Sequence, residues 1–212
     1  MILQNIGHSR GTDKAGIHRF NNRTFLDNYE RYFKYIKDKP VAFFELGIHN
    51  GASLKTWEEY FINAKIVALD IDPTKKQFET NKTKVYIGSQ NDTSVINQIK
   101  HDYPEKFAVI LDDASHLNEL TIQSFELLFE HVMPGGLYII EDTHCTYGGS
   151  NFESAAKNWP GMSYNDKNIN FNNKRETFLN FILPKIQELD SSSGNIFSMH
   201  FYSETLIIEK VR

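Results

Sequence analysis

The chain has 212 residues, 40% of them hydrophobic, which is enough for one domain with a full apolar core. Its 27 acidic and 23 basic residues give a net charge of −4, and no basic run indicates a nucleic acid or a membrane surface as partner. The single cysteine, Cys145, excludes an intrachain disulfide, so we expect a reducing compartment and a cytoplasmic protein. The first residues lack the pattern of a signal peptide. No apolar run reaches about 20 residues, the length of a membrane span.

Residues 1–22 are polar and contain Gly11-Thr12-Asp13-Lys14, a composition that favours a mobile terminal arm. A helix is expected over 24–37, where aromatic and apolar residues recur at helical spacing. Apolar runs of strand length then alternate with helical patterns. Such alternation predicts right-handed βαβ units and a mostly parallel sheet with helices on both faces. The expected strands are 41–46, 65–71, 84–87, 107–111 and 137–140.

The remaining third of the chain is less regular. Pro134-Gly135-Gly136 is expected to end a helix and turn the chain into the strand at 137–140. Residues 146–173 are polar and irregular, which is typical of a loop over an active site or of disorder. A helix over 175–189 should kink or break at Pro184. Residues 195–201 and 205–210 predict an antiparallel hairpin at the sheet edge.

Acidic residues stand where two of the buried strands end. Asp112-Asp113 is followed by His116, and Glu141-Asp142 is followed by His144. One such pair is most often a helix cap or a solvated loop, but two pairs on neighbouring strands favour a ligand site, because ligands of open α/β sheets bind at the carboxyl ends of strands. Carboxylates there suit Mg²⁺, and an imidazole with a pKa of about 6.5 can accept a proton from a substrate hydroxyl.

The first strand ends in a glycine loop. Glu45-Leu46-Gly47 is followed by Gly51 and Ser53, and the two glycines allow backbone to approach a ligand closely. Their spacing differs from the G-x-G-x-x-G of dinucleotide sites, which disfavours an NAD-dependent oxidoreductase. Asp70, at the end of the second strand, can bind both hydroxyls of a ribose, whereas Asp72 better fits a helix cap.

With these motifs, residues 41–145 resemble the class I S-adenosylmethionine-dependent methyltransferases. More narrowly, Asp112-Asp113-Ala114-Ser115-His116 and Glu141-Asp142 match the D-D-x-S-H and E-D motifs of metal-dependent O-methyltransferases that act on sugars, including macrolide-sugar enzymes. The resemblance implies a Rossmann-like α/β fold with a seven-stranded, mostly parallel sheet and a C-terminal antiparallel hairpin. It also implies that Asp113, Glu141 and Asp142 hold a divalent cation such as Mg²⁺, and that His116, beside Asp113, is the general base.

The same resemblance assigns the cofactor and acceptor contacts. Gly11 to Lys14 resembles an arm found ahead of the domain in such proteins, so the arm is expected to reach or cover the methionine carboxylate. His144 and Tyr147 after the E-D motif, and His200 in the hairpin, are candidate acceptor contacts. His144 could instead ligate the metal or pack in its loop, and His200 could pack on the sheet. The residues expected to bind S-adenosylmethionine are Thr12, Lys14, Glu45, Gly47, Gly51, Ser53, Asp70, Gln90 and Asp112.

We therefore expect one methyltransferase domain over 1–212. It would comprise an arm and helix (1–40), a cofactor-binding core (41–145), an active-site loop (146–173), and a helix with the terminal hairpin (174–212). The expected reaction is methylation of a sugar hydroxyl in a glycan precursor or a glycosylated metabolite. Alternatives are a catechol-like or phosphorylated small-molecule acceptor, or a nonenzymatic S-adenosylmethionine-binding protein. The expected partner is a small molecule or sugar, and a homo-oligomer stays open.

Overall fold

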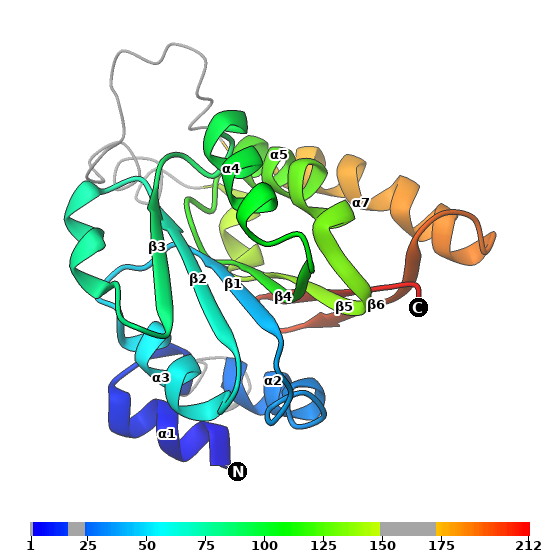
Figure 1. Ribbon diagram of the computed structural model, residues 1–212. Coiled ribbons are helices and arrows are strands. Elements are labelled where there is room, and N and C mark those ends of the chain that lie inside the picture. Colours follow the sequence, from blue (N-terminus) through cyan, green and yellow to red (C-terminus); the bar gives the residue numbers. More distant parts are fainter. Residues whose placement is uncertain (1, 17–23, 149–172) are drawn as a thin grey trace.

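The computed structural model describes residues 2–16, 24–148 and 173–212 (Figure 1). Its strands form one seven-stranded sheet in the order β3-β2-β1-β4-β5-β7-β6. The first five strands are parallel, and β7 pairs antiparallel with β5 and with β6, which confirms the predicted sheet and terminal hairpin. The strands are β1 (Ala42–Leu46), β2 (Lys65–Asp70), β3 (Thr83–Ile87), β4 (Phe107–Asp112), β5 (Val132–Ile140), β6 (Ile196–Tyr202) and β7 (Thr205–Lys210).

Helices cover both faces of this sheet because the buried strands present apolar side chains alternately to each side. Phe43, for example, packs on the α1, α2 and α3 side, and its neighbour Phe44 packs on the α4, α5 and α7 side. No helix in the described parts of the chain is long and apolar enough to cross a membrane. The helices are α1 (Ile2–Arg10), α2 (Phe25–Phe33), α3 (Ala52–Tyr60), α4 (Thr93–Asp102), α5 (Asn118–Leu128) and α7 (Arg175–Asp190), with short 3-10 turns η1 (Asp13–Ala15), η2 (Pro73–Phe78), η3 (Phe129–His131) and η4 (Thr143–Tyr147).

The interpretation of the N-terminal residues as a mobile arm is wrong for residues 2–16. They form α1 and η1, which pack against α2 and α3. Leu3 is fully buried, and Gly7 lies so close to α2 that an added Cβ would come within 2.3 Å of Leu26 Cδ1. Composition does not reveal this packing, because the buried residues of α1, Leu3 and Gly7, form no continuous apolar face.

Two further expectations are corrected by the structure. The segment Pro134-Gly135-Gly136 does not precede a strand but lies inside β5, where the register shifts between Phe107 and Val109 of β4. Gly135 N donates to Val211 O, so the bulge is held by the chain end. Helix α7 continues through Pro184, so the break that the sequence allowed there is absent, while a kink stays a prediction. The predicted active-site loop at 146–173 falls largely outside the described residues.

Candidate cofactor and metal site

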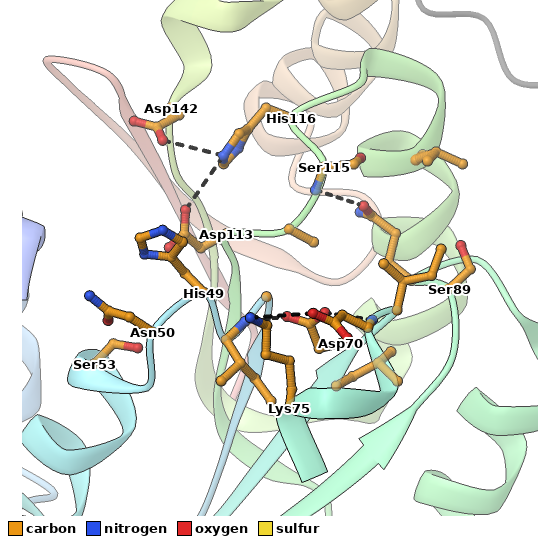
Figure 2. A pocket seen from close by; sticks show the side chains of 18 of the residues that line it. His49, Asn50, Ser53, Asp70, Lys75, Ser89, Asp113, Ser115, His116 and Asp142 are labelled. Atoms are coloured by element: carbon orange, nitrogen blue, oxygen red, sulfur yellow. Dashed lines mark hydrogen bonds and ion pairs between the residues drawn. The ribbon is translucent and has the colours of Figure 1, made fainter. Parts of the chain in front are cut away.

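The candidate site is built on the carboxyl ends of three neighbouring strands. Leu46 of β1 lies opposite Asp112 of β4, and Asp112 lies opposite Ile140 of β5. The next residues along each strand are therefore brought side by side. A cavity of about 360 Å³ opens above these ends (Figure 2). The predicted residues that line it are Thr12, Lys14, Gly47, Ser53, Asp70, Gln90, Asp113, His116 and Asp142.

Strand alternation separates the two acids of the Asp112-Asp113 pair. Asp112 points toward α5, where its carboxylate accepts hydrogen bonds from Ser124 Oγ at 3.0 Å and Tyr138 OH at 3.3 Å. Burial raises the pKa of Asp112 to about 6. Asp113 points to the opposite side, toward η1, and borders the cavity. The sequence left Asp112 open as a structural or a cofactor-side residue; its contacts in the structure support β4, and a cofactor contact stays a prediction.

The glycine loop after β1 is a place of close backbone approach. Gly47 has φ +89°, and an added Cβ would lie 2.1 Å from the carbonyl oxygen of Asp113. Gly51, with φ +75°, begins α3 but does not line the cavity among the described residues. Ile48 N donates to Asp70 Oδ2 at 2.8 Å, which joins this loop to the end of β2. Asp70 borders the cavity, and its contact with a ribose stays a prediction.

Asp72 and Gln90 complete the wall on the β2 and β3 side. Asp72 caps η2 by accepting from Thr74 N at 2.9 Å, which confirms its predicted capping role. Gln90 Nε2 donates to Ser124 Oγ at 2.7 Å, and Gln90 Oε1 accepts from Ser115 N at 3.0 Å. Gln90 therefore holds the turn that leads to His116 while its side chain lines the cavity.

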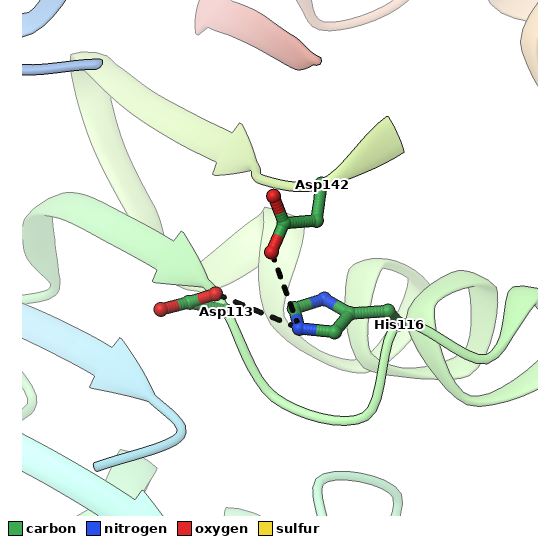
Figure 3. A group of neighbouring side chains, drawn as sticks. All are labelled: Asp113, His116 and Asp142. Carbon is green, nitrogen blue, oxygen red and sulfur yellow. Dashed lines mark ion pairs between the residues drawn. The ribbon is translucent and has the colours of Figure 1, made fainter. Parts of the chain in front are cut away.

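Asp113, His116 and Asp142 meet at one end of the cavity (Figure 3). His116 Nε2 lies 3.4 Å from Asp142 Oδ2 and 3.8 Å from Asp113 Oδ1. His116 and Asp142 have φ of +54° and +52°, a region that side chains other than glycine rarely adopt. Such strain often marks a functional site. Two carboxylates and an imidazole, with ligand atoms within 4.8 Å of one another, form a donor set that fits a divalent cation.

Glu141 and Lys14 are paired with each other in the structure, and their predicted roles at the cation and the cofactor stay predictions. The carboxylate of Glu141 is turned inward, where Oε2 accepts from Lys14 Nζ at 2.6 Å and Oε1 accepts from Tyr29 OH at 2.5 Å. Lys14 Nζ also contacts Asp113 Oδ2 and lies 3.9 Å from Glu45 Oε1. Burial alone lowers the pKa of Lys14, but these carboxylates raise it well above its ordinary value. Lys14 is therefore a buried ammonium among three acids.

Glu45 supports this arrangement from beneath the cavity without lining it. Its side chain is fully buried, and Oε2 accepts from Ser53 Oγ at 2.9 Å. Burial, opposed by Lys14, raises the pKa of Glu45 to about 7. The carboxylate thus accepts from Ser53 and faces Lys14, and its predicted contact with the cofactor stays a prediction.

The three candidate acceptor contacts lie in different surroundings. His144 is exposed, with Nδ1 at 3.4 Å from Glu204 Oε2 and 3.8 Å from Asp142 Oδ1, so it stands beside the acidic end of the cavity. Tyr147 is 67% exposed, and the guanidinium of Arg175 lies 4.7 Å from its ring centroid.

The structure does not bring His200 to the cavity. Its ring packs 5.6 Å from that of Tyr32 on α2, and Nε2 lies 2.9 Å from Ser198 Oγ. The sequence allowed His200 either to contact the acceptor or to pack on the sheet, and the structure shows it packed on the sheet.

Two residues of the site give no recognisable signal in the sequence. Tyr29 belongs to the apolar stripe of α2, yet its hydroxyl binds Glu141. Asn173 Nδ2 donates to His116 O at 2.7 Å and to Cys145 O at 2.9 Å, while Oδ1 accepts from Asn118 N at 2.8 Å. Asn173 lies in an asparagine-rich stretch, and nothing in that composition distinguishes it.

Comparison with known proteins gives clear relatives, although no protein-family model matches the chain. The chain is 34% identical over 145 residues to demethylmacrocin O-methyltransferase of Streptomyces fradiae, covering 65% of this chain and 33% of that protein. It is 29% identical over 205 residues to mycinamicin VI 2''-O-methyltransferase of Micromonospora griseorubida, covering 89% of this chain and 48% of that protein. Its structure matches the MycE methyltransferase of the mycinamycin pathway, in complex with Mg and SAH, with a TM-score of 0.76 and 28% identity over 99% of this chain and 55% of that chain.

The fold is therefore that of a class I S-adenosylmethionine-dependent methyltransferase, as predicted. Within this class, the chain is homologous to sugar O-methyltransferases of macrolide and tetracenomycin pathways, which confirms the resemblance found in the sequence motifs. The chain spans about a third to a half of the length of the curated relatives just described.

Proposed function

We propose that this protein is an S-adenosylmethionine-dependent O-methyltransferase that requires a divalent cation and methylates a hydroxyl of a sugar. The observation that carries the proposal is the meeting of Asp113, His116 and Asp142 at the end of a cavity whose other side holds Asp70. A cofactor site and a cation site thus share one cavity. Relatives that are named for methylation of glycosides support the same activity.

S-adenosylmethionine would occupy the cavity between the glycine loop and the end of β2. Asp70 would bind the ribose hydroxyls, because a carboxylate can accept two hydrogen bonds from a vicinal diol. Gln90 and Ser115 would flank the adenine, and Gly47 would let the backbone pass close to the cofactor. The residues around this space therefore fit the cofactor chemically as well as in position.

Asp113 and Asp142 would hold the cation, with Glu141 behind them as the third predicted ligand. A bound divalent cation would lower the pKa of a neighbouring hydroxyl and help to orient two adjacent sugar oxygens. His116 would accept the proton of the acceptor hydroxyl at a ring nitrogen. The acceptor oxygen would then form a bond to the methyl carbon, and the electron pair of the breaking C–S bond would return to sulfur.

Calorimetry would test the cofactor assignment directly. We expect binding of S-adenosylmethionine and no comparable binding of NAD, since the glycine loop lacks the dinucleotide spacing. Tight NAD binding without S-adenosylmethionine binding would refute the proposed function.

The cation and the base require separate variants. Asp113→Ala should abolish turnover and Mg²⁺ binding while S-adenosylmethionine binding largely survives, and full activity in EDTA would remove the cation from the mechanism. His116→Ala should lower kcat by about 10²- to 10⁴-fold with little change in cofactor affinity. His101→Ala is the matched control, because that histidine is exposed and lies on α4. If His116→Ala abolishes Mg²⁺ binding instead, His116 is a ligand rather than the base.

The acceptor belongs to the proposal and is open to a direct screen. Relatives named for methylation at the 2''-position of mycinamicin VI and on rhamnosyl tetracenomycin C make a glycosylated small molecule the first class to test. Methyl transfer to glycosides or nucleotide-sugars, but not to catechols, would support the sugar assignment. A cytoplasmic location completes the proposal, since the single cysteine favours a reducing compartment.

A further inference from the structure

A buried lysine is held by the carboxylates that are proposed to bind the cation. Lys14 is 2% exposed, and its Nζ contacts Asp113 Oδ2 and Glu141 Oε2. Glu45 Oε1 lies 3.9 Å away as a third acid. Ionised groups are buried at this depth only when oppositely charged groups surround them. Lys14 therefore serves as the internal counter-charge of the acidic cluster in the structure as it stands.

The same contacts engage both oxygens of Glu141, so the ammonium of Lys14 stands where a cation would approach Oε2. Oε2 of Glu141 is taken by Lys14, and Oε1 is taken by the hydroxyl of Tyr29. The two oxygens of Asp113 have different neighbours: Oδ2 contacts Lys14, while Oδ1 faces His116 at the end of the cavity. A divalent cation that used Glu141, or both oxygens of Asp113, would have to displace the ammonium of Lys14.

The chain segment that carries Lys14 is well anchored, so displacement requires only the side chain to move. Lys14 N donates to Asp13 Oδ1 at 3.0 Å, and the carbonyl of Ala15 accepts from Gln4 Nε2 at 2.8 Å. Ala15 itself is buried against the core. The flexible four-carbon stem of a lysine can move its ammonium by several ångströms while such a backbone stays in place.

We propose that Lys14 is a built-in competitor of the divalent cation: its ammonium occupies the carboxylates of Asp113 and Glu141 in the metal-free protein and leaves them when the ion binds. The inference rests on the proposed function, because it concerns the same cation site. Lys14 thereby keeps the acidic cluster folded without metal, and it weakens the affinity of the site for the ion. Removal of the ammonium should reverse both effects.

The first test compares Lys14→Met with the wild-type protein by calorimetric titration with MgCl₂. In the wild-type protein, Mg²⁺ has to break the hydrogen bonds between the Lys14 ammonium and the carboxylates. Lys14→Met lacks these bonds, so Mg²⁺ should bind it about tenfold or more tightly. The variant should also show a lower Tm without metal and a larger rise in Tm on addition of Mg²⁺ than the wild type. Lys55→Met is the matched control, because Lys55 is exposed on α3 and should leave both quantities unchanged.

Equal or weaker Mg²⁺ binding by Lys14→Met would overturn the proposal, because it would make Lys14 an organiser of the site rather than a competitor. Mg²⁺ binding that is equal in both proteins would leave the proposed cation dependence intact. An absence of binding in both would refute the cation dependence itself and this inference with it. The readout is binding, so the outcome does not depend on knowledge of the acceptor.

A measurement on the unaltered chain covers the case in which Lys14→Met does not fold. After isotope labelling of lysine Nζ, NMR should detect a strongly protected Lys14 ammonium in the metal-free protein, since Lys14 is buried and hydrogen-bonded. Lys210 is also buried and bonded to Glu130, so its ammonium gives a second protected resonance that Mg²⁺ should leave unchanged. Saturation with Mg²⁺ should shift the Lys14 resonance or remove it through faster exchange with water. A Lys14 resonance that stays unchanged at saturating Mg²⁺ would overturn the proposal.

Discussion

Gly47→Ala should destabilise the protein strongly, because the new methyl group would have no room. The added Cβ would lie 2.1 Å from Asp113 O, 2.8 Å from Asp113 C and 3.0 Å from Ala114 Cα. All three are backbone atoms, so no side chain can rotate away. The turn after β4 would have to move by roughly 1 Å to restore an ordinary van der Waals contact.

Two physical effects add up in this variant. Residues other than glycine lose about 1–2 kcal/mol in the left-handed region, and Gly47 has φ +89°. Overpacking of a tight site costs about 1–3 kcal/mol more, which gives a loss of about 2–5 kcal/mol in the free energy of unfolding. Gly11→Ala isolates the first effect, because Gly11 has φ +74° with no atom within 4 Å of the added Cβ.

Urea unfolding of both variants and the wild type measures these losses, provided that the m-values agree. We expect Gly47→Ala to lose about 1–3 kcal/mol more than Gly11→Ala. Gly47→Ala should also weaken S-adenosylmethionine binding, since the displaced turn borders the cavity. Equal destabilisation by the two substitutions would refute the close approach of the β1 loop to Asp113.

Three further predictions test other parts of the molecule. Asp70→Ala should weaken S-adenosylmethionine binding in calorimetry by about ten- to a hundredfold through loss of charge-assisted hydrogen bonds, and unchanged affinity would place the ribose elsewhere. Asn173→Ala should lower turnover and cost about 1–3 kcal/mol of stability, because it removes the hydrogen bonds of Asn173 to His116 O and Asn118 N, whereas Asn173→Asp keeps the acceptor for Asn118 and should regain part of that stability. Glu79→Gln should cost about 1 kcal/mol at neutral pH, a value kept small because the carboxylate is 30% exposed. Lys76 and the backbone of Val85 lower the pKa of Glu79 to about 2, so its contribution is present above about pH 4.3 and is lost as the pH falls toward 2. A difference between Glu79→Gln and wild type that persisted at pH 2 would contradict this sign.

The positions of the strands along the chain are accessible from sequence because buried parallel strands have a simple signal, whereas their order in the sheet is known only from the structure. Each is a short apolar run flanked by polar turn residues, and helical patterns separate them. The signal fails at the start of β5, where Pro134-Gly135-Gly136 has the composition of a turn. Its role as a bulge depends on Val132 pairing with Phe107 and on Gly135 bonding to Val211, and neither contact leaves a local pattern.

The acidic residues of the site were also predicted, but the direction in which each side chain points was not. The sequence places Asp112, Asp113, Glu141 and Asp142 at strand ends without saying which way each points. The structure resolves this by the register of β1, β4 and β5, which sends Asp112 toward α5 and Asp113 toward η1. Orientation is a property of the paired sheet rather than of any one strand.

The position of Lys14 follows from that register once it is known. Three acids stand two positions after an apolar residue that faces α1, α2 and α3. Because side chains alternate along a strand, these acids face the same side. They are Glu45 on β1, Asp113 after β4 and Glu141 after β5. Glu45 and Glu141 are buried there and Asp113 is partly exposed, and three carboxylates so close together would repel one another. The folded state therefore requires a cation there, and a lysine from the N-terminal segment provides it in the structure. An N-terminal segment that carries such a charge has to be ordered around Lys14, which is why the expectation of a mobile arm fails at residues 2–16.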